Sequence, residues 1–458
     1  MSEHFDVAVL GMGPGGEVAA GRLLAAGKNV AVIERELIGG ECAYWACIPS
    51  KTVLRPAEAR TEVHKAAGVS GAEVDWASTR EYRDYMIRDL DDSAQAEGYT
   101  AQGATVIRGE AGLTGPGRIR VGNREITAEH IIIATGSEAV IPPIEGIEEI
   151  TAWTNRETYT THDLPERAVV VGGSAVGVET ATFLARFGVQ VTLIHRGDRL
   201  LGREDPRVGE LVHDYLAEAG VDIRLGASAA KAHRNGADSM VILEDGSEVA
   251  ADVVIFGTGR APRTQGLGLE AAGARLGEHG EVLIDEHARA ADNLWAIGDV
   301  TAVMPFTHVA KYQGRIAADA ILGRPRPASY VGIPRVVFAD PEIAAAGLTT
   351  EQAQHRGIRT TATELDLAHA IARPWTYEQD PRGHLGLLAD AERGVLIGAW
   401  AVGPQAGEWI HHAALAIRAQ LPLELLRDQV AQFPTYHEAY QAALDQLDRK
   451  STRLNSSH

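Results

Sequence analysis

Residues 6–34 read DVAVLGMGPGGEVAAGRLLAAGKNVAVIE, and this stretch decides the fold. An apolar strand leads into the glycine pattern Gly11-x-Gly13-x-x-Gly16, which opens a helical segment. A second apolar strand then ends at the acidic residue Glu34. Glycines at this spacing let backbone amides approach a diphosphate, and the helix N-terminus stabilises its charge. A carboxylate at the end of the second strand accepts hydrogen bonds from ribose hydroxyls. The stretch therefore predicts a βαβ unit that binds a dinucleotide.

The same pattern returns at residues 168–196, which read AVVVGGSAVGVETATFLARFGVQVTLIHR. Gly172 and Gly177 take the places of the first and third glycines, and Ser174 replaces the middle one. His195 stands where the first copy has its acidic residue. Two copies of one βαβ unit are the economical explanation, so we expect a second dinucleotide-binding domain.

The end of this second copy indicates which nucleotide binds there. His195 brings no carboxylate that would repel a ribose 2′-phosphate, and Arg196 follows it directly, with Arg199 and Arg203 nearby. Guanidinium groups are well suited to bind phosphate. We therefore predict NADP in preference to NAD, which stays possible. A solvated basic loop is the alternative interpretation.

Composition excludes several functional classes. The chain has 458 residues, enough for about three domains, and a net charge of −19. An acidic surface without long basic runs argues against binding to nucleic acid or anionic lipid. No apolar run approaches the roughly 18 residues of a membrane span, and the N-terminus enters a strand without a cleavage signal. We expect a cytoplasmic enzyme that acts on a small-molecule acceptor.

The remaining strand and turn signals divide the chain. We expect an α/β protein with two Rossmann-like dinucleotide-binding domains and a C-terminal α+β domain. The first domain is predicted at residues 1–150 with a return segment at 276–330, and the second at 151–275. A Pro-rich stretch at 323–334 precedes the third domain at 331–447, where packing or dimerisation is the expected role. Residues 448–458 (DRKSTRLNSSH) resemble a translated sequencing adaptor, an expected artefact that we exclude from the fold prediction.

The segment GGECAYWACIPSK at residues 39–51 contains both cysteines of the chain. Two cysteines are too few for a secreted disulfide scaffold or a structural zinc site, so no metal is predicted. Cys42 and Cys47 can form a disulfide only if the helix that carries them is distorted. Lys51 follows Cys47 by one helical turn, and an ammonium and a helix N-terminus both favour a thiolate. A thiolate is the form that attacks a flavin or a disulfide. Two lone buried cysteines are the alternative interpretation.

These motifs resemble the class I pyridine nucleotide-disulfide oxidoreductases, which include dihydrolipoamide dehydrogenase, glutathione reductase and mercuric reductase. The resemblance covers residues 5–447, and its most specific element is G-G-x-C-x4-C-I-P-S-K. It implies a homodimer through the third domain. It implies FAD in the first unit, held by Gly11, Gly13, Gly16, Glu34, Lys51, Thr135, Gly136 and Asp299. It implies NAD(P)H in the second unit, held by Gly172, Ser174, Gly177, His195, Arg196 and Gly259.

The resemblance also implies catalytic roles. Cys47 is expected to be the flavin-proximal thiol, whose thiolate gives a charge-transfer band with the flavin. Cys42 is expected to be the interchange thiol that meets the acceptor. Glu179 matches the glutamate that pairs with Lys51 beside the flavin. An ordinary carboxylate on a helix surface is the alternative for Glu179.

The sequence departs from the family near its C-terminus. The family's disulfide reductases carry His-Pro-Thr with a glutamate five residues after the histidine, and this dyad of the partner subunit protonates the leaving thiol. Here residues 432–440 read QFPTYHEAY, so Glu438 matches but Phe433 replaces the histidine. Loss of general acid–base help costs typically ~10² to 10⁴-fold in rate. We therefore predict weak activity on lipoamide or glutathione disulfide, unless His437 takes over the proton transfer.

The residues between the cysteines also depart from the family, which usually has smaller side chains there. Tyr44 and Trp45 either line a restricted acceptor pocket or pack into the core.

Several functions remain open on the sequence alone. The main hypothesis is electron transfer from NAD(P)H through FAD to the Cys42–Cys47 disulfide and on to an unidentified acceptor. Reduction of a metal ion or quinone, as in mercuric reductase, and a low-activity dihydrolipoamide dehydrogenase are alternatives. A ketone-carboxylating relative fits less well because it lacks the Ile-Pro-Ser-Lys run. A non-catalytic flavoprotein conflicts with the intact cysteines, Lys51 and Glu179.

Overall fold

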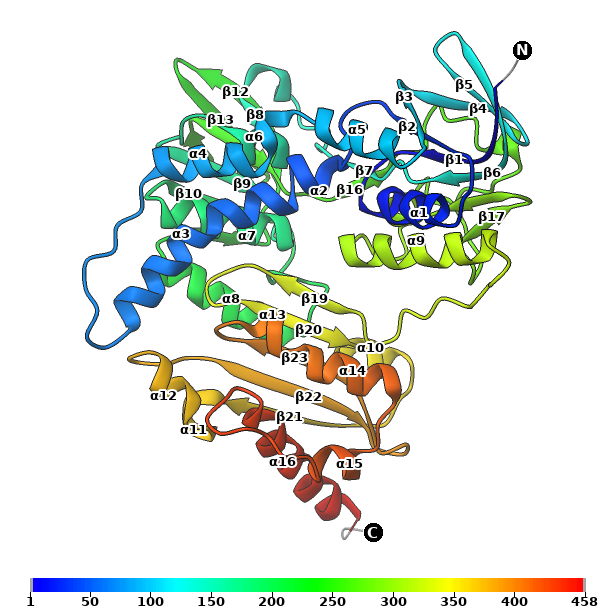
Figure 1. Ribbon diagram of the computed structural model, residues 1–458. Coiled ribbons are helices and arrows are strands. Elements are labelled where there is room, and N and C mark those ends of the chain that lie inside the picture. The colour runs from blue at the N-terminus through cyan, green and yellow to red at the C-terminus, as the bar shows by residue number, and fades with distance from the viewer. Residues whose placement is uncertain (1–2, 456–458) are drawn as a thin grey trace.

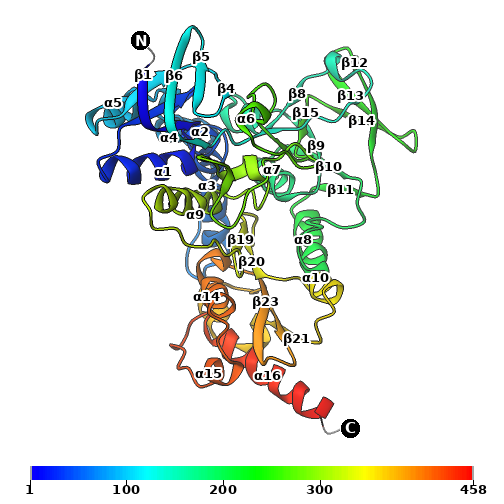
Figure 2. The same ribbon diagram turned by 90° about the vertical axis from the view of Figure 1, so that its right-hand side faces the viewer.

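The computed structural model describes the backbone of residues 3–455 and the side chains of residues 3–449. A mixed sheet and a parallel sheet lie in the upper part of Figure 1, and an antiparallel sheet with its helices lies below them. Figure 2 shows the same lower unit from the side, with the helix α16 (Glu438–Asn455) at its far end.

The first unit contains an eight-stranded sheet with the strand path β17-β18-β6-β1-β2-β3. The second half of its central strand β1, residues 7–10, is a continuous apolar run because helices and other segments cover both of its faces. The helices α1 and α9 pack side by side against this sheet (Figure 1). The strands are β1 (Glu3–Leu10), β2 (Val30–Glu34), β3 (Thr105–Arg108), β4 (Ala111–Gly115), β5 (Arg118–Val121), β6 (Arg124–Ile133), β17 (Arg289–Ala291) and β18 (Leu294–Ala296). The helices are α1 (Pro14–Ala25), α2 (Gly40–Tyr44), α3 (Cys47–Lys65), α4 (Trp76–Met86), α5 (Ser93–Ala101) and α9 (Thr307–Ile321).

The second unit repeats this plan with a five-stranded parallel sheet in the order β11-β10-β9-β15-β8. A three-stranded antiparallel sheet, β12-β13-β14, extends from it, and the small pair β7–β16 connects it to the first unit. The strands are β7 (Ser137–Ala139), β8 (Ala152–Trp153), β9 (Arg167–Val171), β10 (Gln190–His195), β11 (Asp222–Leu225), β12 (Ala229–Asn235), β13 (Asp238–Leu243), β14 (Glu248–Ala251), β15 (Val253–Phe256) and β16 (Arg260–Pro262). The helices are α6 (Asn155–Thr160), α7 (Ala175–Arg186) and α8 (Pro206–Glu218).

The third unit is an antiparallel sheet in the order β19-β20-β23-β22-β21 with helices on its face. Ile410, Ala413, Ala414 and Ile417 are all buried in this core. The strands are β19 (Pro334–Val337), β20 (Ile343–Gly347), β21 (Thr360–Asp366), β22 (His384–Asp390) and β23 (Val395–Val402). The helices are α10 (Thr350–His355), α11 (Leu367–Ala370), α12 (Arg373–Tyr377), α13 (Ala406–Trp409), α14 (His411–Ala419), α15 (Leu423–Arg427) and α16.

The predicted α/β architecture, two Rossmann-like units and a C-terminal α+β unit, is thus confirmed. Leu267, Leu269 and Ala272 pack in the core of the first sheet, within the stretch that the sequence assigned to the second unit. The adaptor-like stretch at 448–458 is helical as far as Asn455, because each residue added to an already nucleated helix gains a backbone hydrogen bond. Residues 456–458 lie outside the described part of the chain.

Candidate active site

The first glycine pattern forms a site that fits a diphosphate. Gly11 has φ +96, and a Cβ there would collide with the carbonyl oxygen of Ala134. Gly13 precedes the first residue of α1, and no side chain caps this helix end. The first-turn amides of α1 therefore remain available to an anion. A Cβ on Gly13 would meet no atom within 4 Å, so there is space for a ligand above it.

Backbone amides hold the acid at the end of β2 in place. The Glu34 carboxylate accepts hydrogen bonds from the amides of Met12 and Glu36, each at 2.8 Å. Its remaining lone pairs are free to accept from ribose hydroxyls. The residues of the first unit therefore fit the adenosine and diphosphate of FAD.

The second unit reproduces this contact with a different side chain. The amide of Gly173 donates to Nδ1 of His195 at 3.1 Å, at the place that corresponds to the Met12–Glu34 contact. Burial, followed by the charge of Arg196, lowers the pKa of His195, which favours the neutral ring. His195 thus keeps the architecture of the acidic position without its negative charge.

Ser174 occupies the N-cap of α7 without capping it. Its hydroxyl donates to the carbonyl oxygen of Gly257 at 2.8 Å, so the first-turn amides of α7 stay free. Arg199 forms an ion pair with Glu351 at 2.6 Å, whereas Arg196 and Arg203 are exposed. Of the arginines that the sequence placed near a 2′-phosphate, Arg199 is therefore already engaged.

A cavity of about 390 Å³ brings most of the expected flavin site together. Its wall also includes Ala175 and Val176 from the start of α7, so the second unit borders the same space. The expected residues that line it are Gly11, Gly13, Glu34, Cys42, Cys47, Lys51, Thr135, Gly136, Glu179 and Asp299. Those outside this wall are Gly16, Gly172, Ser174, Gly177, His195, Arg196, Gly259, Phe433 and Glu438.

The two cysteines do not share one regular helix. Cys42 lies in α2, and Cys47 is the first residue of α3. Trp45 and Ala46 between these helices have non-helical backbone angles, with φ −132 and ψ −4 for Trp45 and φ −131 and ψ −95 for Ala46. Neither cysteine is in a disulfide in this structure. The break brings both sulfurs into the cavity and places Cys47 at a helix N-terminus.

Thr307 is a site residue that the sequence reasoning missed. It begins α9, and its hydroxyl donates to Sγ of Cys42 at 3.3 Å and lies 3.3 Å from Sγ of Cys47. The only sequence signal is that it begins the helix after the Gly298-Asp299 turn. A single hydroxyl thus contacts both sulfurs.

Lys51 and Glu179 form a partly buried ion pair across the two nucleotide units. Nζ of Lys51 lies 2.6 Å from Oε2 of Glu179, a residue that is 8% exposed. The other oxygen of Glu179 accepts from the amide of Phe338 at 3.0 Å, and Nζ of Lys51 lies 4.6 Å from the centre of the Phe338 ring. Glu179 is therefore not a surface carboxylate, and it fixes the ammonium near the cysteines.

The surroundings of the two cysteines shift their pKa values in opposite directions. The pKa of Cys47 is lowered to about 6, and the largest cause is the hydrogen bond with Cys42. Burial acts in the opposite direction, and the hydrogen bond with Thr307 and the charge of Lys51 lower the pKa further. The hydrogen bond with Cys47, followed by burial, raises the pKa of Cys42. At neutral pH the reduced pair therefore holds one proton on Cys42 and a thiolate on Cys47.

This assignment gives a pH prediction. In the reduced protein, the Cys47 thiolate should be present above pH 6 and should be lost as the pH falls through its pKa of about 6. When Cys47 is ionised, the Thr307 hydroxyl can turn its single proton from Cys42 to the Cys47 thiolate. Thr307→Val removes this hydrogen bond and should lower the thiolate-to-thiol ratio at pH 6 about tenfold. Thr307→Ser should keep the wild-type ratio. Thiolate absorbance near 240 nm measures the titration, and an unchanged curve in Thr307→Val would contradict the role of the hydroxyl.

The flavin side of the cavity has a second set of ordered polar groups. Ser137 donates to Asp299 at 2.7 Å, and Thr135 donates to the carbonyl oxygen of Arg263 at 2.7 Å. Ser137 contacts only one oxygen of Asp299, so the carboxylate keeps further acceptor capacity at the cavity wall. This arrangement suits a hydroxylated chain such as the ribityl group of FAD.

Tyr44 and Trp45 have different environments. Tyr44 is fully buried, and its hydroxyl donates to the carbonyl oxygen of Ile38 at 3.2 Å, so it packs in the core. Trp45 is half-buried and lies under the guanidinium of Arg156. Neither side chain lines the cavity that contains the cysteines.

The C-terminal motif lies on the third unit. Phe433 is 75% exposed, and Glu438 accepts from the amide of Thr435 at 3.2 Å. His437 packs near His412, with the two ring centres 5.9 Å apart. Within one chain, none of the three residues Phe433, His437 and Glu438 belongs to the cavity wall around the cysteines.

Two further features bear on metals and membranes. Within the described residues, no group of three or more His, Cys, Asp or Glu side chains is arranged to hold a metal ion. Of the helices that the structure describes, none combines the length and apolar character required to cross a membrane.

Comparison with known proteins agrees with this site. Residues 5–314 match the family model "Pyridine nucleotide-disulphide oxidoreductase", and residues 333–444 match its dimerisation domain. A mercuric reductase from Staphylococcus aureus is 32% identical over 98% of this chain and 84% of its own length. A dihydrolipoyl dehydrogenase from Halobacterium salinarum is 32% identical over 97% of this chain and 96% of its own.

Solved structures show the same similarity over the whole fold. The Cu(II) complex of the HOCl-induced flavoprotein disulfide reductase RclA from Escherichia coli has a TM-score of 0.86 and 29% identity, and the match covers 97% of this chain and 100% of that one. The two nucleotide units, the cysteine pair and the family matches lead to one conclusion. The chain belongs to the class I pyridine nucleotide-disulfide oxidoreductases, which are NAD(P)H-dependent flavoenzymes that contain FAD.

Proposed function

We propose that this enzyme transfers electrons from NADPH through FAD to the Cys42–Cys47 disulfide, and from there to a small-molecule acceptor. The observation that carries the proposal is the common cavity, where the cysteines and the Lys51–Glu179 pair meet the first glycine pattern and the start of α7. Bound FAD supplies the two-electron carrier between the nicotinamide and the disulfide.

The residues around the disulfide then control where charge and protons go. Two electrons and one proton convert the disulfide into a thiolate on Cys47 and a thiol on Cys42. Lys51 and the Thr307 hydroxyl stabilise the thiolate, and Glu179 holds the ammonium of Lys51 in position. Cys42 gives its proton to solvent, and its sulfur bonds to the acceptor. The Cys47 thiolate then attacks the Cys42 sulfur, which re-forms the disulfide, breaks the bond to the acceptor and releases the acceptor reduced by two electrons.

The acceptor is proposed to need no protonated thiol as leaving group. Phe433 cannot transfer a proton, so cleavage of a substrate disulfide lacks the usual general acid. The lack of a general acid at position 433 favours reduction of a metal ion or a quinone as the second candidate function. The relatives do not decide between these acceptors, since they include both mercuric reductases and disulfide reductases.

A homodimer is part of this proposal. The third unit matches the family's dimerisation domain. It also exposes large apolar side chains, namely Leu415, Leu425, Val430 and Phe433. A second copy of the chain would cover such a surface.

The preference for NADPH is proposed from His195 and Arg196. A guanidinium contact with the 2′-phosphate is a charge-assisted hydrogen bond, so Arg196→Ala should raise KM for NADPH about tenfold. KM for NADH should change less than about twofold, because NADH lacks the 2′-phosphate that Arg196 is proposed to contact. Steady-state kinetics with both nucleotides measures this. A wild-type preference for NADH, or an equal effect on both nucleotides, would contradict the proposal.

An anaerobic titration tests the function itself. Addition of NADPH to the FAD-containing protein should bleach the flavin absorbance and produce a long-wavelength charge-transfer band. Reduced enzyme should then be offered lipoamide, glutathione disulfide, quinones, Hg(II) and Cu(II) in turn. If NADPH reduces no flavin and gives no such band, the proposed function is wrong.

A further inference from the structure

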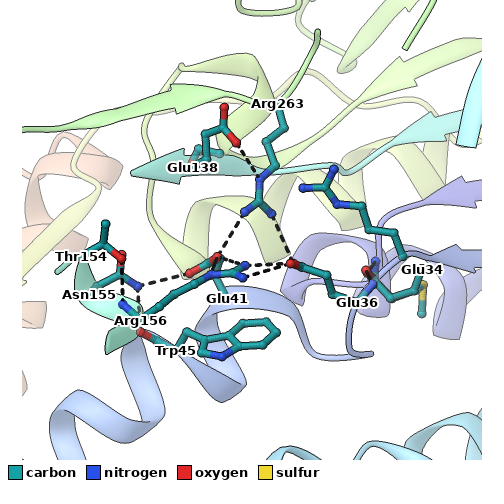
Figure 3. Close-up of polar contacts among 12 residues, drawn as sticks. Glu34, Glu36, Glu41, Trp45, Glu138, Thr154, Asn155, Arg156 and Arg263 are labelled. Carbon is teal, nitrogen blue, oxygen red and sulfur yellow. Dashed lines mark hydrogen bonds and ion pairs between the residues drawn. The ribbon is translucent and has the colours of Figure 1, made fainter. Parts of the chain in front are cut away.

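The residue before the interchange thiol is the centre of an ionic cluster (Figure 3). Nε of Arg156, from α6 in the second unit, lies 2.8 Å from Oε1 of Glu41, which directly precedes Cys42. The same guanidinium forms a bidentate pair with Glu36 at 3.0 and 2.9 Å. Arg156 thus binds two carboxylates of the first unit.

Other side chains from outside α2 complete the contacts of Glu41. Arg263 lies 3.3 Å from its Oε1, and Asn155 donates to its Oε2 at 3.3 Å. Arg260 approaches Oε2 at 3.8 Å. The side chain of Glu41 is 19% exposed and that of Arg156 is 28% exposed, so solvent screens this cluster only partly. Partial screening leaves the charges of this cluster effective at short range, and Glu41 is the residue directly before Cys42.

The same elements hold the far end of the cysteine segment. Asn155 donates to the carbonyl oxygen of Trp45 at 2.8 Å. The guanidinium of Arg156 lies 4.1 Å from the centre of the Trp45 ring. Contacts from α6 thus hold both ends of the short stretch from Glu41 to Trp45, which contains Cys42.

We propose that Arg156 is a positioning residue for Cys42, because it anchors and neutralises the Glu41 carboxylate beside the thiol that attacks the acceptor. The inference rests on the proposed role of Cys42 as interchange thiol. An uncompensated carboxylate at this place would oppose ionisation of Cys42, and only the thiolate attacks. A tethered segment also keeps the sulfur in a productive position.

Two substitutions with opposite expected effects test this. Arg156→Gln leaves Glu41 less compensated, so the pH profile of Cys42 alkylation should move to higher pH, with a rate at pH 8 about tenfold lower. Glu41→Gln removes the carboxylate itself, so its profile should move to lower pH. Arg156→Lys keeps the charge but loses the bidentate and stacked contacts, so its rate should lie between those of the wild type and Arg156→Gln.

Iodoacetamide is the probe, and tandem mass spectrometry of the peptide that contains both cysteines follows alkylation of Cys42 separately from that of Cys47. The Cys42 thiolate displaces iodide and forms a thioether. The FAD-containing protein is first reduced with a phosphine and freed of it, so the measurement does not depend on reduction by NADPH. Failure of the proposed function and failure of this inference are therefore separate results.

Arg335→Gln is the matched control. Arg335 forms a similarly buried bidentate pair with Glu204, at 2.8 Å for both contacts, away from the cysteine segment. The Arg335→Gln substitution should leave the pH profile of Cys42 alkylation unchanged. Shifts of the same sign in Arg156→Gln and Glu41→Gln would indicate a purely structural role and overturn the inference, as would unchanged profiles. If Arg156→Gln does not retain flavin, Glu41→Gln alone decides by the direction of its shift.

Discussion

Replacement of Cys47 by serine is expected to abolish the long-wavelength band of the NADPH-reduced enzyme and to lower acceptor turnover by at least about 10³-fold. The pKa of Cys47 is lowered to about 6 by the hydrogen bond with Cys42, and Thr307 and Lys51 contribute to the same effect. A serine hydroxyl does not ionise in this range and cannot form the disulfide. Anaerobic absorbance spectra and steady-state rates measure both effects.

Cys42→Ser is the control for this assignment. It should keep a thiolate on Cys47, and therefore a long-wavelength band even before NADPH is added, while turnover is lost as well. The two variants thus differ in spectrum although both are inactive. A band that persists in Cys47→Ser and vanishes in Cys42→Ser would show that the two roles are exchanged.

Phe433→His is expected to raise turnover of lipoamide or glutathione disulfide about 10²-fold. Histidine at this position can protonate the leaving thiol, and such general acid help is worth typically ~10² to 10⁴-fold. Glu438 already follows at the family's spacing and can orient the new imidazole. The measurement is kcat/KM with NADPH and each disulfide in excess.

A matched variant separates proton transfer from a change in shape. Phe433→Asn is polar and of similar reach to histidine, but it cannot act as a general acid near neutral pH, so it should give no gain. In Phe433→His, the additional Glu438→Gln substitution should remove part of the gain. If Phe433→His stays as slow as wild type, the low disulfide activity has another cause.

The amino-acid sequence predicts the fold because its decisive signals are local. The glycine pattern at Gly11, Gly13 and Gly16 and its copy at Gly172 and Gly177 lie within single strand–helix–strand stretches. The turn and the helix start of each stretch depend on residues within that stretch and not on distant parts of the chain. For the same reason the spacing from Cys42 through Cys47 to Lys51 is by itself enough to indicate a thiolate site.

The tertiary structure decided the contacts between distant parts of the chain. Thr307 reaches the sulfur of Cys47 across 260 positions of sequence, and Arg156 reaches Glu41 across 115. No local pattern marks such partners, because they meet only when α9 and α6 pack against the cysteine segment. Packing likewise buried Tyr44 in the core.

The first βαβ unit shows the same division. The sequence alone determined that residues 6–34 form a dinucleotide unit, since glycine geometry and the apolar periodicity act within that stretch. It also determined that a redox-type cysteine pair follows. Only the tertiary structure placed Lys51, Glu179 and Thr307 around that pair, because charge, burial and hydrogen bonds at the sulfurs arise from three separate elements, α3, α7 and α9.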